Sequence, residues 1–187
     1  MKYFIKVLCW FIPFKNVRHY LKHKYVYFNG YDNKWTRQIY KQCECGKDLW
    51  CGGPTFLNDK CELADRVCFN GCQVHGTGKL KIGCSFHSGI ELLIITSNHN
   101  YDNGKHIPYS PKDNIAKDVV IGDAVWCGSR VTILPGTHIG NGVIIQAGSV
   151  VHGDIPHCAI IGGNPAQIIK YRNKDHFYKL YKQGRFN

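Results

Sequence analysis

The sequence lacks a hydrophobic run long enough to cross a bilayer. Its most apolar stretch, residues 3–14, is interrupted by Lys6 and Pro13 and is shorter than the ~20 residues that a membrane-spanning helix needs. It also lacks the small-residue cleavage site of a secretory signal. We therefore expect a cytoplasmic protein. Because residues 1–24 join an apolar helical face to a basic run, they are expected to lie on an anionic membrane surface or to dock on protein.

Acidic residues are scarce, with 13 Asp and Glu against 24 Lys and Arg. The excess positive charge lies at the two ends: residues 1–48 carry a net +7 and residues 165–187 a net +5, whereas residues 49–164 carry −1. A nucleic-acid-binding protein usually builds its basic stripe into the folded surface, so this distribution argues against that class. It suits a polyanionic ligand or an anionic membrane near the ends, and equally flanks that only increase solubility.

The ten cysteines do not have the spacing of a zinc site. Cys43, Cys45 and Cys51 lie close together in the sequence and could bind a metal, but they too lack that spacing. Cys61 and Cys127 occupy positions of the repeat described next, where a free thiol behaves as a small hydrophobe. We expect reduced thiols and no bound metal.

The sequence does contain a repeat with a period of six residues. One series of aliphatic or small residues is Ile115, Ile121, Cys127, Ile133, Ile139, Ile145 and Val151, and a second, two residues earlier, is Val119, Val125, Val131, Thr137, Val143 and Ser149. Neither an α-helix nor a flat strand has this period, whereas a parallel β-helix of hexapeptide turns does. Each hexapeptide then forms one side of a prism, and equivalent residues stack every 18 positions at ~4.8 Å.

The repeat divides the chain into three parts. Residues 1–54 are expected to form an N-terminal helical and capping segment, residues 55–165 an all-β repeat, and residues 166–187 a basic C-terminal helix. A looser hexapeptide phase before residue 75 shifts register across residues 75–78. The polar loop 97–114 then interrupts the period, and a long loop in a regular scaffold is more often functional than ornamental. Because the interior of such a prism is filled, ligands must bind outside it or between subunits, and its flat sides favour a homotrimer.

The segment 122–156, followed by residues 160–170, closely resembles the hexapeptide-repeat acyltransferases, most of all the branch that holds maltose, galactoside and polysaccharide O-acetyltransferases. The resemblance covers about residues 55–172, and its most specific parts are VWCGS, QAGSVV, GGNPA and the histidine loop. It implies a left-handed β-helix, an exception to the usual right-handed crossover. It also implies a trimer and acetyl-CoA as the donor.

The resemblance assigns the chemistry of the loop to His99, which stands where the family carries a catalytic histidine. Acyl transfer needs a base to take the proton of the attacking group, and imidazole suits that task near neutral pH. Asp102 matches an aspartate that orients the loop or the imidazole, and a turn-forming aspartate is an equal alternative. Asn70 resembles an asparagine near the acceptor pocket of the family.

The resemblance also assigns a donor site, in which coil corners with small residues let the pantetheine chain approach backbone amides. The matching positions are Trp126, Gly128, Ser129, Ala147, Gly148, Lys170 and Arg172. Trp126 is expected at the cleft wall, and the last two residues at the phosphates. Gln167 and the pair His152–Gly153 replace usual phosphate-binding residues, so anchoring is expected to be weaker or shifted toward Arg172 and Lys174.

The acceptor is expected to be a sugar hydroxyl in surface-polysaccharide biosynthesis, because both ends of the chain resemble those of enzymes from such pathways. The N-acetylation of a nucleotide-linked amino sugar is an alternative that shares the scaffold and the histidine. A non-catalytic β-helix scaffold is a second alternative. A γ-type carbonic anhydrase is a third, but its three zinc-binding histidines would have to converge, and His75, His87 and His99 are spaced by 12 rather than 18.

Overall fold

The computed structural model describes residues 33–186, so the expectations for residues 1–24 lie outside the described residues. Within them the elements are α3 (Lys34–Gln42), β1 (Glu44–Cys45), β2 (Trp50–Cys51), β3 (Thr55–Phe56), β4 (Cys61–Leu63), β5 (Cys68–Phe69), β6 (Cys72–His75), β7 (Leu80–Ile82), β8 (His87–Ser88), β9 (Leu92–Ile95), β10 (Ser97–Asn100), β11 (Ser110–Ala116), β12 (Val119–Ile121), β13 (Trp126–Cys127), β14 (Thr132–Ile133), β15 (His138–Ile139), β16 (Ile144–Ile145), β17 (Val150–Val151), β18 (Asp154–Ile155), β19 (Ala159–Gly163), β20 (Ala166–Tyr171) and α4 (Lys174–Lys182).

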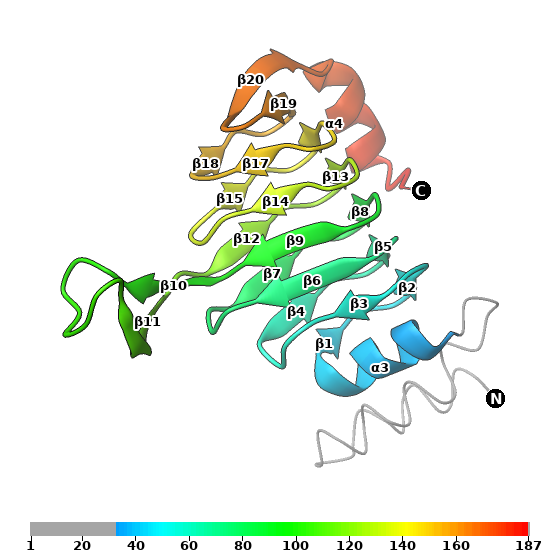
Figure 1. Ribbon diagram of the computed structural model, residues 1–187. Coiled ribbons are helices and arrows are strands. Elements are labelled where there is room, and N and C mark those ends of the chain that lie inside the picture. The colour runs from blue at the N-terminus through cyan, green and yellow to red at the C-terminus, as the bar shows by residue number, and fades with distance from the viewer. Residues whose placement is uncertain (1–32, 187) are drawn as a thin grey trace.

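The short strands stack into three sheets that form the sides of a prism (Figure 1). Sheet one is β1-β4-β7-β12-β15-β18, sheet two is β2-β5-β8-β13-β16-β19-β20, and sheet three is β3-β6-β9-β14-β17. Neighbouring strands are parallel throughout, apart from the last pair of sheet two. Between the coil of β12 to β14 and the coil of β15 to β17 the paired residues are 18 apart, as Val120 and His138 are. The predicted left-handed β-helix is confirmed.

Both six-residue series point into the prism, with one exception. From residue 119 to residue 151, every member of the two series is at most 3 % exposed. Ile115 is 41 % exposed and lies on β11, so its assignment to the core was wrong. The chain leaves the coil after Thr96 and re-enters it at Lys117, where the Lys117 N–H donates to the Thr96 carbonyl at 2.9 Å. Ile115 therefore keeps the period by coincidence of spacing.

The predicted loop 97–114 is an ordered antiparallel hairpin, β10 with β11, which projects from the prism (Figure 1). We call it the arm. Its ladder pairs Ser97 with Ala116 and His99 with Asn114. The register shift expected across residues 75–78 lies at the corner between β6 and β7, immediately beside the base of the arm.

The β-helix begins earlier than the predicted residue 55, because β1 to β3 already form a coil. Its interior positions continue the six-residue period but are occupied by Cys43, Leu49, Cys51 and Thr55, all buried. Burial raises the pKa of the Cys51 thiol to about 11, so this thiol stays protonated and acts as a small apolar side chain. No group of three His, Cys, Asp or Glu residues in 33–186 could hold a metal ion.

Helix α3 closes the first coil with polar contacts that a purely aliphatic pattern does not reveal. Asn33 caps the helix by accepting from the Trp35 and Thr36 amides. The buried Thr36 hydroxyl accepts from the Cys51 amide at 3.0 Å. The Tyr40 hydroxyl accepts from the Leu49 amide at 3.1 Å. These bonds satisfy backbone groups at the open end of the prism.

The C-terminal segment differs from the single helix expected over residues 166–187. Residues 166–171 form β20, which pairs with β19 and extends sheet two, and only residues 174–182 are helical. Asn173 caps α4 by accepting from the His176 amide. The Tyr181 hydroxyl donates to the Asp123 carboxylate and so holds α4 against the prism; this bond raises the pKa of Tyr181 to about 12. Neither described helix is long and apolar enough to cross a membrane.

Candidate functional site

His99 lies on β10, near the base of the arm, with its side chain exposed. The ring of Tyr109 stacks on the imidazole with 3.9 Å between centroids and 6° between planes. Because Tyr109 covers one face of the imidazole, the ring can adopt few orientations. Both ring nitrogens lie at the edge of the imidazole, which the stacked ring does not cover. Sequence reasoning missed Tyr109, because its place opposite His99 depends on how the arm folds back.

The arm is fixed by its own polar side chains. The Asn100 amide donates to the Asp113 carboxylate at 2.7 Å, and the Lys105 backbone N–H donates to the Ser110 hydroxyl at 2.6 Å. Asp102 is exposed near the arm tip, and its carboxylate accepts no hydrogen bond from any residue in 33–186. The carboxylate that orders the arm is therefore that of Asp113, and the structure does not bring Asp102 to the imidazole.

A hollow of about 410 Å³ opens between the arm and the neighbouring coil corner. We call it the His99 hollow; it is lined by His75, Gly76, Thr77, Ile95, Ser97, Asn98, His99 and Asn114. His87 lies on sheet two and borders a different hollow, so the three histidines considered for zinc are divided between two places. An exposed imidazole at the edge of such a hollow can take a proton from a bound hydroxyl or amine.

The small residues of the predicted donor site form a column at the corner between sheets two and three. Gly128 touches the coil above so closely that an added Cβ would lie 2.5 Å from the Ala147 amide nitrogen. The Gly148 N–H donates to the Ser129 carbonyl at 2.9 Å. The backbone N–H groups of Ser129 and Ala147 donate to no residue in 33–186. Two backbone amides on one corner thus have no hydrogen-bond partner among the described residues.

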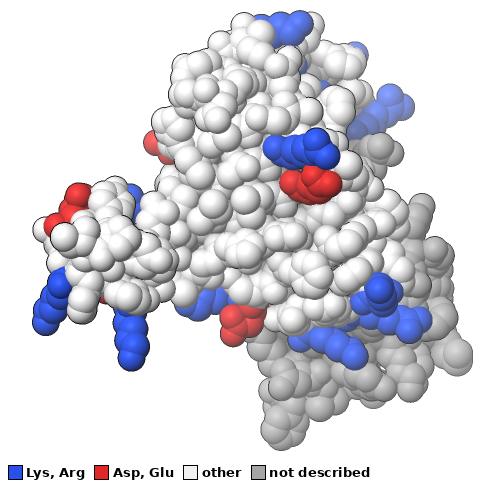
Figure 2. Space-filling model, viewed as in Figure 1, with Lys and Arg blue, Asp and Glu red and all other residues white. Residues whose placement is uncertain are grey.

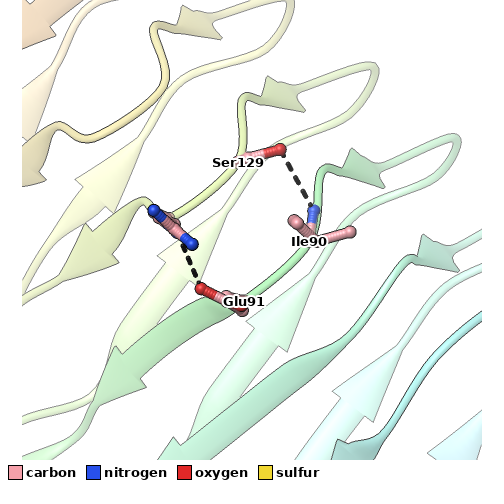
Figure 3. Close-up of polar contacts among 4 residues, drawn as sticks. Ile90, Glu91 and Ser129 are labelled. Atoms are coloured by element: carbon pink, nitrogen blue, oxygen red, sulfur yellow. Dashed lines mark hydrogen bonds and ion pairs between the residues drawn. The ribbon is translucent and has the colours of Figure 1, made fainter.

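The coil below extends this corner. The Ser129 hydroxyl accepts from the Ile90 amide at 3.3 Å, and the Arg130 guanidinium pairs with Glu91 at 2.8 Å (Figure 3). Both charged side chains are more than 60 % exposed, so the pair adds little stability. Asn70 lies on the same column one coil further down, where its amide donates to the Ser88 carbonyl at 2.7 Å. The structure therefore places Asn70 below the corner that carries Gly128, Ser129, Ala147 and Gly148, and not beside His99. We call this corner the donor corner, after the prediction made for it.

Trp126 and Arg172 meet in a second hollow of about 420 Å³ between sheet two and α4. Trp126 is 57 % exposed on the outer face of β13. The Arg172 guanidinium donates to the Gly142 carbonyl at 3.2 Å and lies 4.9 Å from the ring centre of Phe177. Lys170 is exposed on β20, opposite Ile160 of β19. Lys170 and Arg172 lie toward the C-terminal end of the prism, whereas Trp126 lies on β13, the middle strand of sheet two.

Within one chain, His99 lies far from the donor corner. Ile90 and Glu91 stand at the corner where β9 starts, and the arm leaves the prism just after the end of β9. Five extended residues separate these two corners, a span of ~16 Å. His99 and Ser129 thus lie at opposite edges of sheet three.

Comparisons with known proteins agree with this architecture. A family model described as bacterial transferase hexapeptide (six repeats) matches residues 118–153. WbbJ of Escherichia coli (strain K12), described as a lipopolysaccharide biosynthesis O-acetyl transferase, is 44 % identical over 145 residues, 73 % of this chain and 69 % of WbbJ. The acetyltransferase YvoF of Bacillus subtilis (strain 168) is 53 % identical over 94 residues, 49 % of this chain and 47 % of YvoF.

Among solved structures, a galactoside acetyltransferase in complex with coenzyme A superimposes with a TM-score of 0.63 at 21 % identity, covering 87 % of this chain and 83 % of that one. This likeness concerns the fold. The identity to WbbJ extends over more than two thirds of both chains, and the hexapeptide match falls on the coils that carry the corner of Gly128 and Ala147. This protein therefore belongs to the hexapeptide-repeat acetyltransferases.

Proposed function

We propose that the protein transfers the acetyl group of acetyl-CoA to a sugar hydroxyl, with His99 as the general base. The observation that carries this proposal is the exposed imidazole, held by Tyr109 at the edge of a hollow that is lined mainly by polar residues. The relative WbbJ is named as an O-acetyl transferase of lipopolysaccharide biosynthesis, which supports oxygen as the acceptor atom and a polysaccharide precursor as the acceptor.

In the proposed reaction, an imidazole nitrogen of His99 removes the proton of the acceptor hydroxyl while its oxygen attacks the thioester carbonyl. The tetrahedral intermediate then collapses, the carbon–sulfur bond breaks, and the imidazolium returns its proton to the leaving CoA thiolate. Either free corner amide, that of Ser129 or Ala147, could donate to the carbonyl oxygen as it gains charge, an interaction worth ~3–4 kcal/mol in other acyl-transfer enzymes. We assign the CoA phosphates to Lys170, whose ammonium is exposed, with Arg172 assisting.

We infer that the site is completed by a second subunit of a homotrimer. His99 and the donor corner lie at opposite edges of sheet three, so two neighbouring prisms that face each other through this sheet could bring them together. The outer face of sheet three is uncharged along its central row, which consists of Phe56, Gln73, Leu93, Thr132 and Val150. Figure 2 shows this face nearly free of charged side chains. The corresponding row of sheet one contains Glu44, Glu62, Lys81, His138 and Asp154.

Subunit mixing tests this arrangement. At an acetyl-CoA concentration well below the raised KM of Gly128→Ala, we expect His99→Ala and Gly128→Ala subunits to show little turnover as separate trimers. Trimers reassembled from equal amounts of the two variants should contain about a quarter of the active sites of the wild type. A site is intact only where the arm comes from a Gly128→Ala subunit and the corner from a His99→Ala subunit, and each of these occurs in about half of the cases. Sedimentation should give three times the 21.3 kDa of the chain. A monomer in solution, or no recovery from mixed trimers, would contradict the shared site.

The activity itself is tested with acetyl-CoA and a panel of sugars. Thiol release should depend on the sugar, and mass spectrometry of the product should show one added acetyl group. Treatment of the product with mild base should remove an ester-linked acetyl group but leave an amide. A product that keeps its acetyl group under these conditions would replace O-transfer by N-transfer. If thiol release did not depend on any sugar, the proposed acetyl transfer to a sugar would be refuted.

A further inference from the structure

The corner that faces His99 is irregular and firmly held. Successive inward residues of this coil, Cys72 and Leu80, are eight positions apart instead of six, so extra residues project at the corner 75–79. The Lys60 ammonium donates to the Thr77 carbonyl at 2.6 Å, and the Asn58 amide donates to the Gly76 carbonyl at 3.3 Å. From the arm, the Ser97 hydroxyl accepts from the Thr77 amide at 3.3 Å.

Contacts from the coil below and from the arm thus fix the backbone of this corner. Gly76 has φ of +106°, and a Cβ there would lie 2.6 Å from the Ser97 amide nitrogen. The corner and the base of the arm are therefore packed against each other with no room between them at this point. A preorganised wall of this kind loses little entropy when a ligand binds.

Polar side chains along the wall remain unpaired. Within 33–186, neither the Thr77 hydroxyl nor the side-chain amide of Asn114 makes a hydrogen bond, although both residues line the His99 hollow. Asn114 is the strand partner of His99 across the arm. A hydroxyl and an amide can each both donate and accept, as sugar hydroxyls do.

The charge of the hollow restricts its ligand. Among residues 33–186, those that line it include no Lys, Arg, Asp or Glu, and the nearby Lys60 ammonium donates to the Thr77 carbonyl. Proteins hold the pyrophosphate of a nucleotide-linked sugar with cationic side chains or helix N-termini, and the described residues that one chain contributes to this hollow include no Lys, Arg or helix N-terminus. Its volume of about 410 Å³ is within the range of small-ligand sites.

We propose that the His99 hollow is the acceptor subsite, that it takes an uncharged sugar ring, and that Thr77 and Asn114 select it by hydrogen bonds to ring hydroxyls. The inference rests on the proposed function, because it places the acceptor hydroxyl beside the His99 imidazole. It separates two acceptor classes: neutral glycosides fit the subsite, whereas activated nucleotide sugars would leave their charge without a partner there.

Two variants and one control test the proposal. Thr77→Val keeps the shape of the side chain and removes its hydroxyl, and Asn114→Ala removes the amide. Each should lower kcat/KM for the acceptor by roughly fivefold or more, the size of one uncharged hydrogen bond, while KM for acetyl-CoA stays unchanged. The matched control is Asn103→Ala, an exposed asparagine of the same arm outside the His99 hollow; its acceptor kcat/KM should equal that of the wild type.

The acceptor panel pairs each neutral methyl glycoside with the UDP derivative of the same sugar. We expect turnover of at least one neutral glycoside, with a lower kcat/KM for its UDP derivative. Turnover of UDP sugars alone, or an unchanged acceptor kcat/KM in Thr77→Val and Asn114→Ala, would overturn the subsite while leaving acetyl transfer intact. A wild-type protein that acetylates no sugar would instead refute the proposed function.

Discussion

Replacing His99 by alanine is expected to lower kcat by at least ~10²-fold, because general-base catalysis by an imidazole contributes ~10²–10⁴-fold. The side chain is exposed on the arm and stacked on Tyr109, so its removal leaves no cavity in the core. Thermal unfolding should therefore stay near that of the wild type. Acetyl-CoA binding, measured by calorimetry, should also persist, because the contacts proposed for the donor come from the Ser129 and Ala147 amides and from Lys170, and not from His99.

The control for this variant is His106→Ala. His106 is an exposed histidine of the same arm, and it borders the hollow at the arm tip instead of the one at its base. It should retain wild-type turnover. If both variants turned over substrate at the wild-type rate, the general base would have to be another group. If both lost activity equally, the whole arm would matter and His99 would have no separate role.

Replacing Gly128 by alanine is the second change with a large expected effect. The added Cβ would lie 2.5 Å from the nitrogen and 2.9 Å from the Cα of Ala147. These are backbone atoms of the next coil, which cannot move aside as the end of a flexible side chain can. Overpacking of this kind costs ~1–3 kcal/mol, which for a chain of this size lowers Tm by a few to ~10 °C. The free amide of Ala147 would also be displaced or covered, so KM for acetyl-CoA should rise.

A second glycine of the corner separates the loss of donor binding from the loss of stability. Gly148 has φ of +72° and no atom within 4 Å of an added Cβ, and Gly184, just beyond α4, has φ of +63° and similar free space. Alanine at either position is expected to cost ~1–2 kcal/mol of backbone strain. Only Gly148→Ala should raise KM for acetyl-CoA. Equal KM values in these two variants would argue against pantetheine passing over this corner.

The scaffold could be predicted from the sequence because every coil repeats the same local packing. Ile121, Ile139 and their equivalents contact the same kinds of neighbours one coil above and below, so a correct period suffices to place them. The start of the first coil was not predicted because Cys43 and Cys51 replace aliphatic residues at its interior positions. Ile115 was misplaced because spacing alone does not reveal where the chain leaves the coil.

The ends and the arm depend on contacts between segments that the period does not describe. Residues 166–171 pair with β19, and this tertiary pairing prevails over the helical pattern of their side chains. His99 could be recognised through its resemblance to a family, but Tyr109 could not, because their stacking requires the arm to fold back. The same is true of Asn114, which reaches the His99 hollow only through its strand partner.

The sequence by itself determined the prism, the interior of its later coils and the two places where chemistry is expected, His99 and the corner of Gly128 and Ala147. Tertiary structure alone decided that the arm is an antiparallel hairpin, that the corner 75–79 forms a wall of the His99 hollow, and that His99 and the donor corner lie apart within one chain. The physical reason is the range of the interactions. Stacking between coils repeats at a fixed spacing, so the period of the sequence predicts it. The site is formed by irregular segments whose contacts occur only once, and no period predicts those.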